Sequence, residues 1–364
     1  MFDAGSLIRA HIRDLDAYEP IRPFEVLAEQ LGRAPETIIK LDANENPYGP
    51  PDAVQAALAE LEYPHIYPDP QCTALRQALA AHTGVPVDNL LAGAGADELI
   101  DLTMRLLLEP GDAILNCPPT FGMYQFDAGV NGARVVSVPR RADFSLDVEA
   151  VEAAVASESP KLLFLANPNN PDGSLTSRAT LERLLALPLL FILDEAYIEF
   201  AEAGCSCLAM VAGSENLIVL RTFSKWAGLA GLRVGYSAFP TSLMAQLWKI
   251  KQPYNVSVSA QAAACAALKE IAVLDDIGAK LIAERERLAT ALETLPYLQP
   301  YPSQANFILC RVVKRSAHGV KDALAEDGIL VRYFDKPGLR DHIRISVGRP
   351  EHTDRLMAAL ERLV

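Results

Sequence analysis

The sequence predicts an α/β fold with a large domain, built on a mostly parallel β-sheet, and a smaller α+β domain. Between about residues 90 and 240, short and continuously apolar runs alternate with helix-like segments. Such runs are typical of parallel strands that are covered by helices on both faces. After Pro253 the sequence changes to a long segment rich in Ala, Leu, Glu and Lys, followed by alternating strand-like segments. This change indicates the smaller domain.

Six apolar runs in the first region are predicted strands, at residues 113–116, 134–138, 162–166, 189–193, 217–220 and 234–238. In the second region we expect a helix from 261 to about 295 and strands at 306–312, 329–333 and 342–347. We expect the chain to divide into an N-terminal segment (1–40) that joins the small domain, a large domain (41–265) and a C-terminal small domain (266–364).

Composition excludes several classes of protein. Of the 364 residues, 50% are hydrophobic and 22% charged, which predicts a globular chain. The net charge of -13 argues against nucleic acid or an anionic membrane as a partner. The stretch MFDAGSLIRAHIRDLD has acids and no apolar core, and no later run is long enough to cross a bilayer, so we expect a cytoplasmic protein. Six cysteines without a CxxC pair and six histidines without ligand-like spacing predict no metal site.

Polar side chains follow three of the predicted strands. They lie at residues 167–171, 194–197 and 221–225. In such sheets, ligands collect beyond the carboxyl ends of the strands. The sequence therefore predicts a binding site at this edge of the large sheet.

Lys225 is the candidate nucleophile of this site. It lies in RTFSKWAGLAGLRVGY, where the residues between it and Arg233 are uncharged and small or apolar. Such residues suit a closely packed backbone. An ordinary solvated lysine is the alternative interpretation. A lysine in apolar surroundings has its ammonium form disfavoured, which frees the amine to form a Schiff base.

Asp194 closes a predicted buried strand, where a carboxylate is costly unless it meets a cation or hydrogen-bond donors. It could cap the next helix. Alternatively, it could keep a pyridinium nitrogen protonated, so that the ring accepts electrons from a carbanion. Tyr197 could then hydrogen-bond a substituent of that ring.

The stretch LLAGAGADELI, residues 90–100, predicts a phosphate site, because a glycine-rich turn leads into a helix N-terminus. Glu98 stands where a GxGxxG motif needs its third glycine, which argues against a dinucleotide-binding dehydrogenase. Ser224 and Arg233 would add contacts to a phosphate. The lysine, the aspartate and the phosphate cradle together point to pyridoxal 5'-phosphate as the cofactor.

With these residues, the sequence resembles the fold-type I aminotransferases, and most closely the histidinol-phosphate aminotransferases of histidine biosynthesis. The resemblance covers nearly the whole chain through KLDANENPYGP, YPDPQ, GAGADELI, NPNNPDG, DEAYIEF, RTFSKWAGLAGLRVGY, KQPYNVS, NFILCRV and IRISVG. It implies a fold-type I transferase with a central, mostly parallel seven-stranded sheet and a smaller α+β domain.

The resemblance also implies roles around the cofactor ring. Lys225 would form the Schiff base and move the proton between the substrate Cα and the cofactor C4'. Asp194 would pair with the pyridine nitrogen. Tyr197 and Asn170 would hold the phenolic oxygen of the ring, and Phe121 would stack on the ring.

For the cofactor phosphate, the resemblance implies contacts with the backbone of Ala96 and Asp97 and with the side chains of Ser224 and Arg233. Tyr67 resembles the tyrosine that reaches the phosphate from the neighbouring subunit. A homodimer with shared active sites is therefore implied.

For the substrates, the resemblance implies four binding residues, namely Arg344, Arg332, Tyr18 and Asn46. Arg344 would bind the anionic group of glutamate or of the phosphorylated substrate, and Arg332 would bind the phosphate. A surface arginine on a strand is the alternative for Arg332. The implied reaction transfers the amino group of glutamate to imidazole-acetol phosphate and gives histidinol phosphate and 2-oxoglutarate.

Three residues depart from the family pattern: Phe121 where tyrosine is frequent, Asp172 where threonine is usual, and Trp226 where a small residue is more common. Within this fold, an aromatic aminotransferase and a threonine-phosphate decarboxylase remain alternatives. A ligand-sensing transcription regulator is disfavoured, because the roughly forty residues before KLDANENP are too few and too acidic for a helix-turn-helix module.

Overall fold

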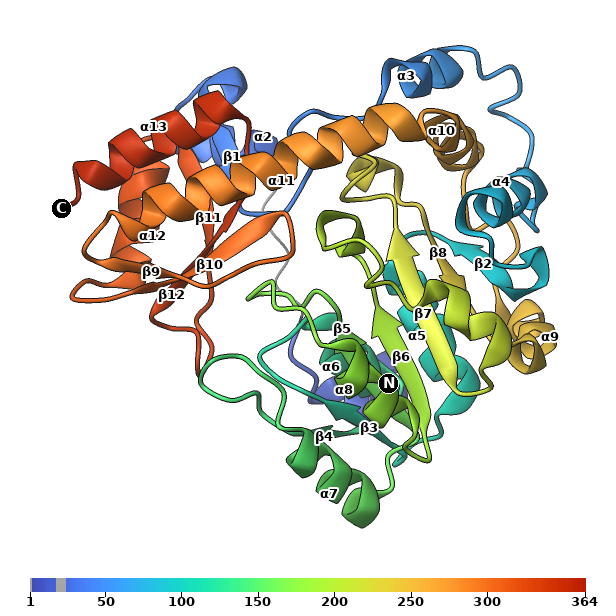
Figure 1. Ribbon diagram of the computed structural model, residues 1–364. Coiled ribbons are helices and arrows are strands. Elements are labelled where there is room, and N and C mark those ends of the chain that lie inside the picture. Colours follow the sequence, from blue (N-terminus) through green and yellow to red (C-terminus); the bar gives the residue numbers. More distant parts are fainter. Residues whose placement is uncertain (1, 18–23) are drawn as a thin grey trace.

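The large sheet is the frame of the molecule (Figure 1). The computed structural model describes residues 2–17 and 24–364, and in this part the strand order of the large sheet is β2-β8-β7-β6-β5-β3-β4. The β8 strand is antiparallel to both neighbours, whereas the other pairs are parallel. The predicted mostly parallel, seven-stranded α/β sheet is thus confirmed. Its strands are β2 (Leu90–Gly93), β3 (Ala113–Asn116), β4 (Arg134–Ser137), β5 (Leu162–Ala166), β6 (Leu190–Asp194), β7 (Leu217–Thr222) and β8 (Gly235–Ala238).

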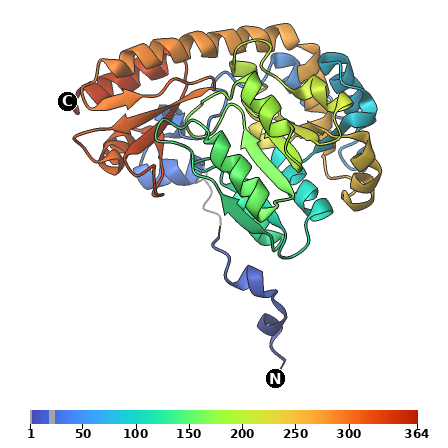
Figure 2. The ribbon, with the colours of Figure 1, turned by 60° about the horizontal axis from the view of Figure 1, so that its bottom comes forward.

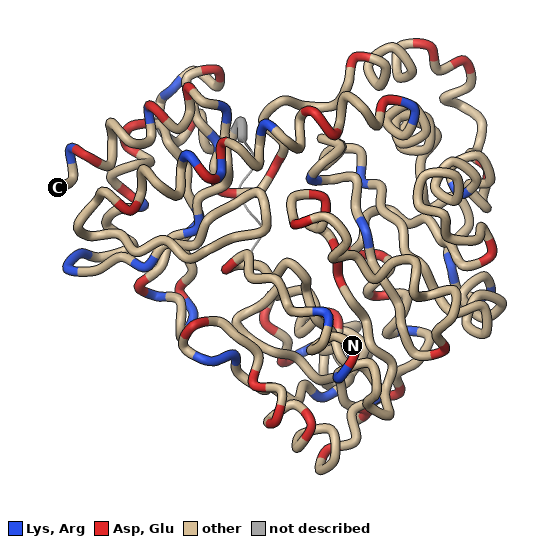
Figure 3. Tube along the Cα trace, in the orientation of Figure 1, with Lys and Arg blue, Asp and Glu red and all other residues tan. Residues whose placement is uncertain are grey.

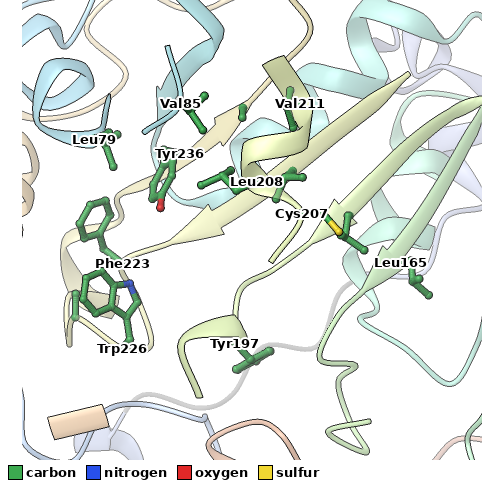
Figure 4. Packing of buried hydrophobic residues seen from close by; sticks show 14 of the residues in the cluster. Leu79, Val85, Leu165, Tyr197, Cys207, Leu208, Val211, Phe223, Trp226 and Tyr236 are labelled. Carbon is green, nitrogen blue, oxygen red and sulfur yellow. The ribbon is translucent and has the colours of Figure 1, made fainter. Parts of the chain in front are cut away.

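Alternate residues of these strands enter two separate apolar clusters, one on each face of the sheet. In β5, for example, Leu163 and Leu165 belong to one cluster, and Leu162 and Phe164 to the other. Figure 4 shows part of the first cluster, in which the ring of Phe223 lies beside the rings of Trp226 and Tyr236. Burial on both faces explains why the strands are continuously apolar in sequence.

Helices cover both faces of the large sheet. One face packs against α5 (Ala96–Leu107), α6 (Met123–Val130) and α9 (Thr241–Ile250). The other packs against α3 (Asp52–Ala59), α4 (Thr73–Thr83), α7 (Val148–Glu158), α8 (Arg178–Leu185) and α10 (Val258–Lys269). Short 3₁₀ turns complete the connections, at η3 (Val87–Asn89), η4 (Ile198–Phe200), η5 (Leu208–Gly213) and η6 (Ala230–Leu232).

A second sheet with the order β1-β11-β12-β10-β9 forms the smaller unit. Its strands are β1 (Ile39–Leu41), β9 (Leu298–Pro300), β10 (Phe307–Val312), β11 (Ile329–Tyr333) and β12 (His342–Ser346). It packs with α11 (Ile271–Glu293), α12 (Ala317–Glu326) and α13 (Pro350–Glu361) around a core of its own. Near β1 lie α2 (Phe24–Leu31) and η2 (Pro35–Thr37). The strand β1 spans the predicted boundary between residues 40 and 41. The division of the chain into three parts stays a prediction.

The single helix predicted from 261 to about 295 is wrong, because the chain forms two helices there. Ser257 caps α10 by accepting a hydrogen bond from the backbone of Ala260, and the chain leaves the helical conformation at Glu270 (φ -110°, ψ 35°). The second helix, α11, then runs across both units (Figure 1). Its first half gives Leu274, Ile277 and Leu281 to the large core, and its second half gives Leu288 and Leu292 to the small core.

In the N-terminal segment, η1 (Ala4–Leu7) is exposed and projects from the body of the molecule (Figure 2), whereas α1 (Ala10–Arg13) contacts α6. The segment also touches the large unit where Arg9 donates a hydrogen bond to the carbonyl oxygen of Val130. Figure 3 shows acidic and basic residues interspersed along the outer helices. Within the described ranges, no helix combines the length and apolar character needed to cross a membrane, and no group of side chains is arranged to hold a metal ion.

Candidate active site

A cavity of about 160 Å³ opens at the carboxyl ends of β5, β6 and β7, beside the N-terminus of α5. This is the edge at which the sequence predicts a site. The residues that line the cavity are Ala43, Glu45, Ala96, Asp97, Phe121, Ala166, Asn170, Asp194, Ala196, Tyr197, Thr222, Ser224, Lys225, Ala230 and Arg233. Nine of them are predicted cofactor residues, so the fold brings together side chains from as far apart in the sequence as Ala96 and Arg233.

The residues predicted to bind a phosphate lie together, where the α5 N-terminus meets Arg233. Gly95 has a backbone (φ +86°) that strains other residues, and an added Cβ would lie 2.5 Å from Nη2 of Arg233, so a larger residue would displace this guanidinium. Arg233 donates from Nη2 to Asp97 Oδ2 (3.0 Å) and from Nη1 to Ser224 Oγ (3.5 Å). Helix N–H groups, a hydroxyl and a guanidinium therefore converge on one place, as an anion requires.

Asp194, at the end of β6, is only 5% exposed. Its Oδ2 accepts a hydrogen bond from the hydroxyl of Tyr124 (2.6 Å), and its Oδ1 accepts one from the backbone N–H of Ala196 (3.0 Å). Burial raises the pKa of Asp194 to about 6, against the effect of these two donors. The carboxylate is thus held in place in surroundings that favour a cationic partner.

Lys225 follows β7 and points into the same cavity. Its Nζ donates to the carbonyl oxygen of Ala43 (3.2 Å) and lies 5.9 Å from the ring centroid of Tyr197. Burial, together with the charge of Arg344, lowers the pKa of Lys225 to about 8. A free amine therefore exists close to neutral pH, as a nucleophile or a proton acceptor requires.

The reactivity of Lys225 is expected to rise with pH and to level off above about pH 8, because the amine is unprotonated above its pKa of about 8. At pH 7 it should present about 300 times more free amine than a lysine with the ordinary pKa of 10.5. The measurement is the rate of borohydride-trapped labelling of Lys225 by a small aldehyde, located by peptide mapping. Exposed Lys249 is the internal reference. A labelling midpoint near 10.5 for Lys225 would contradict this account.

The hydroxyl of Tyr197 connects both units of the protein. It accepts hydrogen bonds from Asn44 (3.1 Å) and Asn170 (3.5 Å), and burial raises the pKa of Tyr197. Asn44 is itself tied to the small unit, because its Oδ1 accepts from Ser346 Oγ (2.9 Å) and its backbone oxygen accepts from Asn306 (2.9 Å). The position of the small unit is therefore linked to the polar groups of the cavity.

Arg344 reaches the cavity edge from β12 of the small unit. It donates to Asn170 Oδ1 (2.6 Å) and to the carbonyl oxygen of Asp42 (2.8 Å). Arg332 is its directly paired residue on antiparallel β11. Both guanidinium groups lie over the ring of Phe334, at 5.5 Å from Arg332 and 5.6 Å from Arg344. Both arginines thus contact the same aromatic ring.

Among the described residues, four predicted site residues do not line the cavity, namely Arg344, Arg332, Tyr67 and Asn46. Tyr67 is 78% exposed and stacks on Tyr254, with 4.5 Å between the ring centroids. Asn46 is buried and donates to the carbonyl oxygen of Trp226 (2.9 Å), which supports the turn after Lys225. Tyr18 lies outside the described residues.

Sequence reasoning missed Tyr124 and Asn44. Tyr124 is fully buried, and its only sequence signal is its place three residues after Phe121, in the first turn of α6. Asn44 has a left-handed backbone (φ 57°), which asparagine tolerates better than most residues. Neither signal identifies a contact with Asp194 or Tyr197, because both contacts arise only when distant segments pack.

The model of the family described as aminotransferase class I and II matches residues 36–360. The chain belongs to the class I and II aminotransferases. This aminotransferase is 56% identical, over 98% of its length and 86% of the relative, to a chloroplastic histidinol-phosphate aminotransferase of Nicotiana plumbaginifolia. It is 54% identical to a histidinol-phosphate aminotransferase of Roseiflexus castenholzii, with 98% of each chain covered.

A solved structure is similar along the whole aminotransferase chain. It is the histidinol-phosphate aminotransferase of Sinorhizobium meliloti in complex with pyridoxal-5'-phosphate, with a TM-score of 0.89, 32% identity and 99% of both chains covered. The predicted membership of this family is therefore confirmed.

Proposed function

We propose that this aminotransferase binds pyridoxal 5'-phosphate in the cavity and transfers the amino group of glutamate to imidazole-acetol phosphate, forming histidinol phosphate and 2-oxoglutarate. The residues present fit the cofactor. Within the described residues, buried Asp194 accepts two hydrogen bonds and forms no ion pair, and a protonated pyridine nitrogen would supply its missing cation. The cradle formed by Ala96, Asp97, Ser224 and Arg233 suits the phosphate.

When bound, this cofactor supplies an electron-accepting ring that stabilises a carbanion at the substrate Cα. The protein then has three tasks. The amine of Lys225, with its pKa lowered to about 8, accepts and returns the Cα proton. Asp194 would hold the ring nitrogen protonated, and Phe121, which lines the cavity, would pack against the ring.

Tyr197 and Asn170 would hold the phenolic oxygen of the cofactor, because their polar atoms line the cavity and already lie within 3.5 Å of each other. Asn170 also contacts Arg344. A substrate anion bound by Arg344 would therefore lie close to the ring. This arrangement orients the substrate for proton removal.

The observation that carries the substrate assignment is the opposition of Arg332 and Arg344. Like charges on directly paired positions of neighbouring strands destabilise a sheet. The pair is favourable when an anion lies between the two guanidinium groups, and a phosphate can accept bidentate hydrogen bonds from arginine. A phosphorylated substrate therefore fits better than an uncharged side chain, in agreement with the names of the relatives.

Replacement of Arg332 by alanine is expected to raise KM for histidinol phosphate by roughly 10- to 100-fold, because a charge-assisted hydrogen bond to phosphate is lost. The KM for phenylalanine should change little. The measurement is steady-state transamination with both amines, monitored with 2-oxoglutarate as acceptor. Arg340→Ala is the matched control, since Arg340 is exposed and pairs with Asp335. Equal losses with both amines would mean that Arg332 binds no phosphate, and a preference of the wild type for phenylalanine would identify an aromatic aminotransferase.

We also propose a homodimer in which Tyr67 contributes to the partner's site. The proposal is supported by four exposed apolar side chains that lie in two segments joined by the Tyr67–Tyr254 stack, namely Tyr63, Ile66, Tyr67 and Tyr254. Small-molecule substrates remain the expected ligands, with no nucleic acid and no membrane. The cytoplasmic location stays a prediction, and the Nicotiana relative is chloroplastic by name.

A further inference from the structure

Three loops at the carboxyl edge of the large sheet are tied together behind the cavity. They follow β3, β4 and β5, and the first and third carry Phe121 and Asn170, which line the cavity. Neither Phe121 nor Asn170 is part of a regular strand, so its position depends on what holds its loop. The tie between the loops consists of side chains that do not line the cavity.

Asn169 is the link between the first and third loops. It is fully buried, and its Oδ1 accepts a hydrogen bond from Thr120 Oγ1 (2.7 Å). Its Nδ2 donates to the carbonyl oxygen of Pro119 (3.1 Å). The side-chain amide of Asn169 therefore holds the residues that precede Phe121, and Asn169 itself directly precedes Asn170 in the chain.

Asp172 orients this amide. It is 1% exposed, its Oδ1 accepts a hydrogen bond from Asn169 Nδ2, and its Oδ2 accepts one from the backbone N–H of Ser174 (3.0 Å). The oxygen and the nitrogen of a side-chain amide have similar shapes, so shape alone does not decide which of them faces Asp172. An ionised carboxylate can only accept hydrogen bonds. Asp172 therefore allows only the orientation of Asn169 in which Nδ2 donates and Oδ1 faces Thr120.

Arg140, in the loop after β4, supplies the balancing charge. It is buried, donates to the carbonyl oxygens of Cys117 (3.3 Å) and Phe144 (3.0 Å), and leaves Nη2 without a hydrogen-bond partner in the described residues. Burial lowers the pKa of Arg140, and the charge of Asp172 acts in the opposite direction. An uncharged residue at 172 would remove the charge that most favours this buried guanidinium.

We propose that Asp172 is a positioning residue that acts through Asn169 to fix Phe121 and Asn170 against the bound cofactor. The inference rests on the proposed function, since it assigns these residues to that cofactor. It explains a side chain that the reaction itself does not use. It also gives a reason for an acid at this position. The two carboxylate oxygens accept hydrogen bonds from Asn169 and Ser174, whereas threonine has a single hydroxyl oxygen that can also donate.

The test compares Asp172→Asn, Asn169→Ala and the double variant with the wild type. Asp172→Asn should raise the Kd for pyridoxal 5'-phosphate roughly tenfold. It should also shift the pH midpoint of the visible absorption band of the bound cofactor, since Asn170 no longer meets the phenolic oxygen correctly. The double variant should be no worse than Asn169→Ala, because the two residues act in one pathway.

Asp143→Asn is the matched control, because Asp143 lines the same cavity of about 440 Å³ as Asp172 but is exposed. Among the described residues, its side chain accepts hydrogen bonds only from Ser145, in its own loop. If Asp172→Asn does not fold, Asp172→Thr takes its place in the same measurements, because the threonine hydroxyl keeps one acceptor for the backbone N–H of Ser174. A lower melting temperature with unchanged Kd and unchanged pH midpoint would overturn the inference. Absence of the visible band in the wild type would instead overturn the proposed function.

Discussion

Replacement of Lys225 by alanine is expected to reduce transamination by roughly 10⁴-fold, because the variant loses the group that moves the Cα proton. Lys225 is the side chain whose ammonium form is disfavoured by burial and whose Nζ opens into the cavity. The loss should appear in kcat rather than in KM, since Arg344 and Arg332 are untouched. The measurement is single-turnover kinetics with histidinol phosphate on the cofactor-loaded variant.

Two controls separate chemistry from folding in that experiment. Lys249→Ala removes an exposed lysine of α9 and should leave kcat unchanged. Borohydride should attach the cofactor covalently to the wild type and not to Lys225→Ala, while equilibrium binding of the cofactor persists through the phosphate cradle. Full activity of Lys225→Ala would refute the assignment of the site.

Asp194→Asn is expected to lower kcat by roughly 10²- to 10³-fold, which is the size of effect seen when one preorganised electrostatic group is removed. The substitution keeps the shape of the side chain and removes its negative charge. Binding should also depend on pH in the wild type. Below about pH 6 the carboxyl of Asp194 becomes protonated, so it can no longer pair with a cationic ring nitrogen, and cofactor affinity should fall.

The measurement is the Kd of pyridoxal 5'-phosphate between pH 5 and 8, by fluorescence titration of both proteins. In Asp194→Asn the fall in affinity centred near pH 6 should be absent, whereas the pH dependence that comes from the Lys225 amine should remain. The matched control is Asp127→Asn, because burial raises the pKa of Asp127 to about 7 in α6 but its side chain does not line the cavity. If Asp127→Asn removed the pH dependence and Asp194→Asn did not, the ring nitrogen would have another partner.

The sequence predicts the frame of the site well, for a physical reason. Strands buried on both faces must be continuously apolar, so the polar residues that end them are conspicuous, as at Asp194 and Lys225. The ends of individual strands are less certain: β7 continues to Thr222, two residues beyond its apolar run, because Arg221 and Thr222 still pair with β8. Backbone pairing, and not hydrophobicity, decides these last positions.

What could not be predicted depends on contacts between distant segments. The bonds from Tyr124 to Asp194 and from Asn44 to Tyr197 span 70 and 153 residues, and no local pattern encodes them. The helix also breaks at Glu270 without a neighbouring proline or glycine that would have predicted the break. The resemblance to a family supplied Arg332 and Arg344 as substrate ligands, but their direct pairing across β11 and β12 became visible only in the structure.

The helix α11 has a consequence for how the protein folds and melts. Its first half belongs to one hydrophobic core and its second half to the other. Neither core can lose its share of α11 without fraying a helix on which the other depends, so the two cores are coupled in free energy. Although the chain has two sheets, it should lose its structure in one cooperative transition and not in two. A chain interrupted within α11 would leave both cores incomplete, and neither unit would be a good candidate for separate expression.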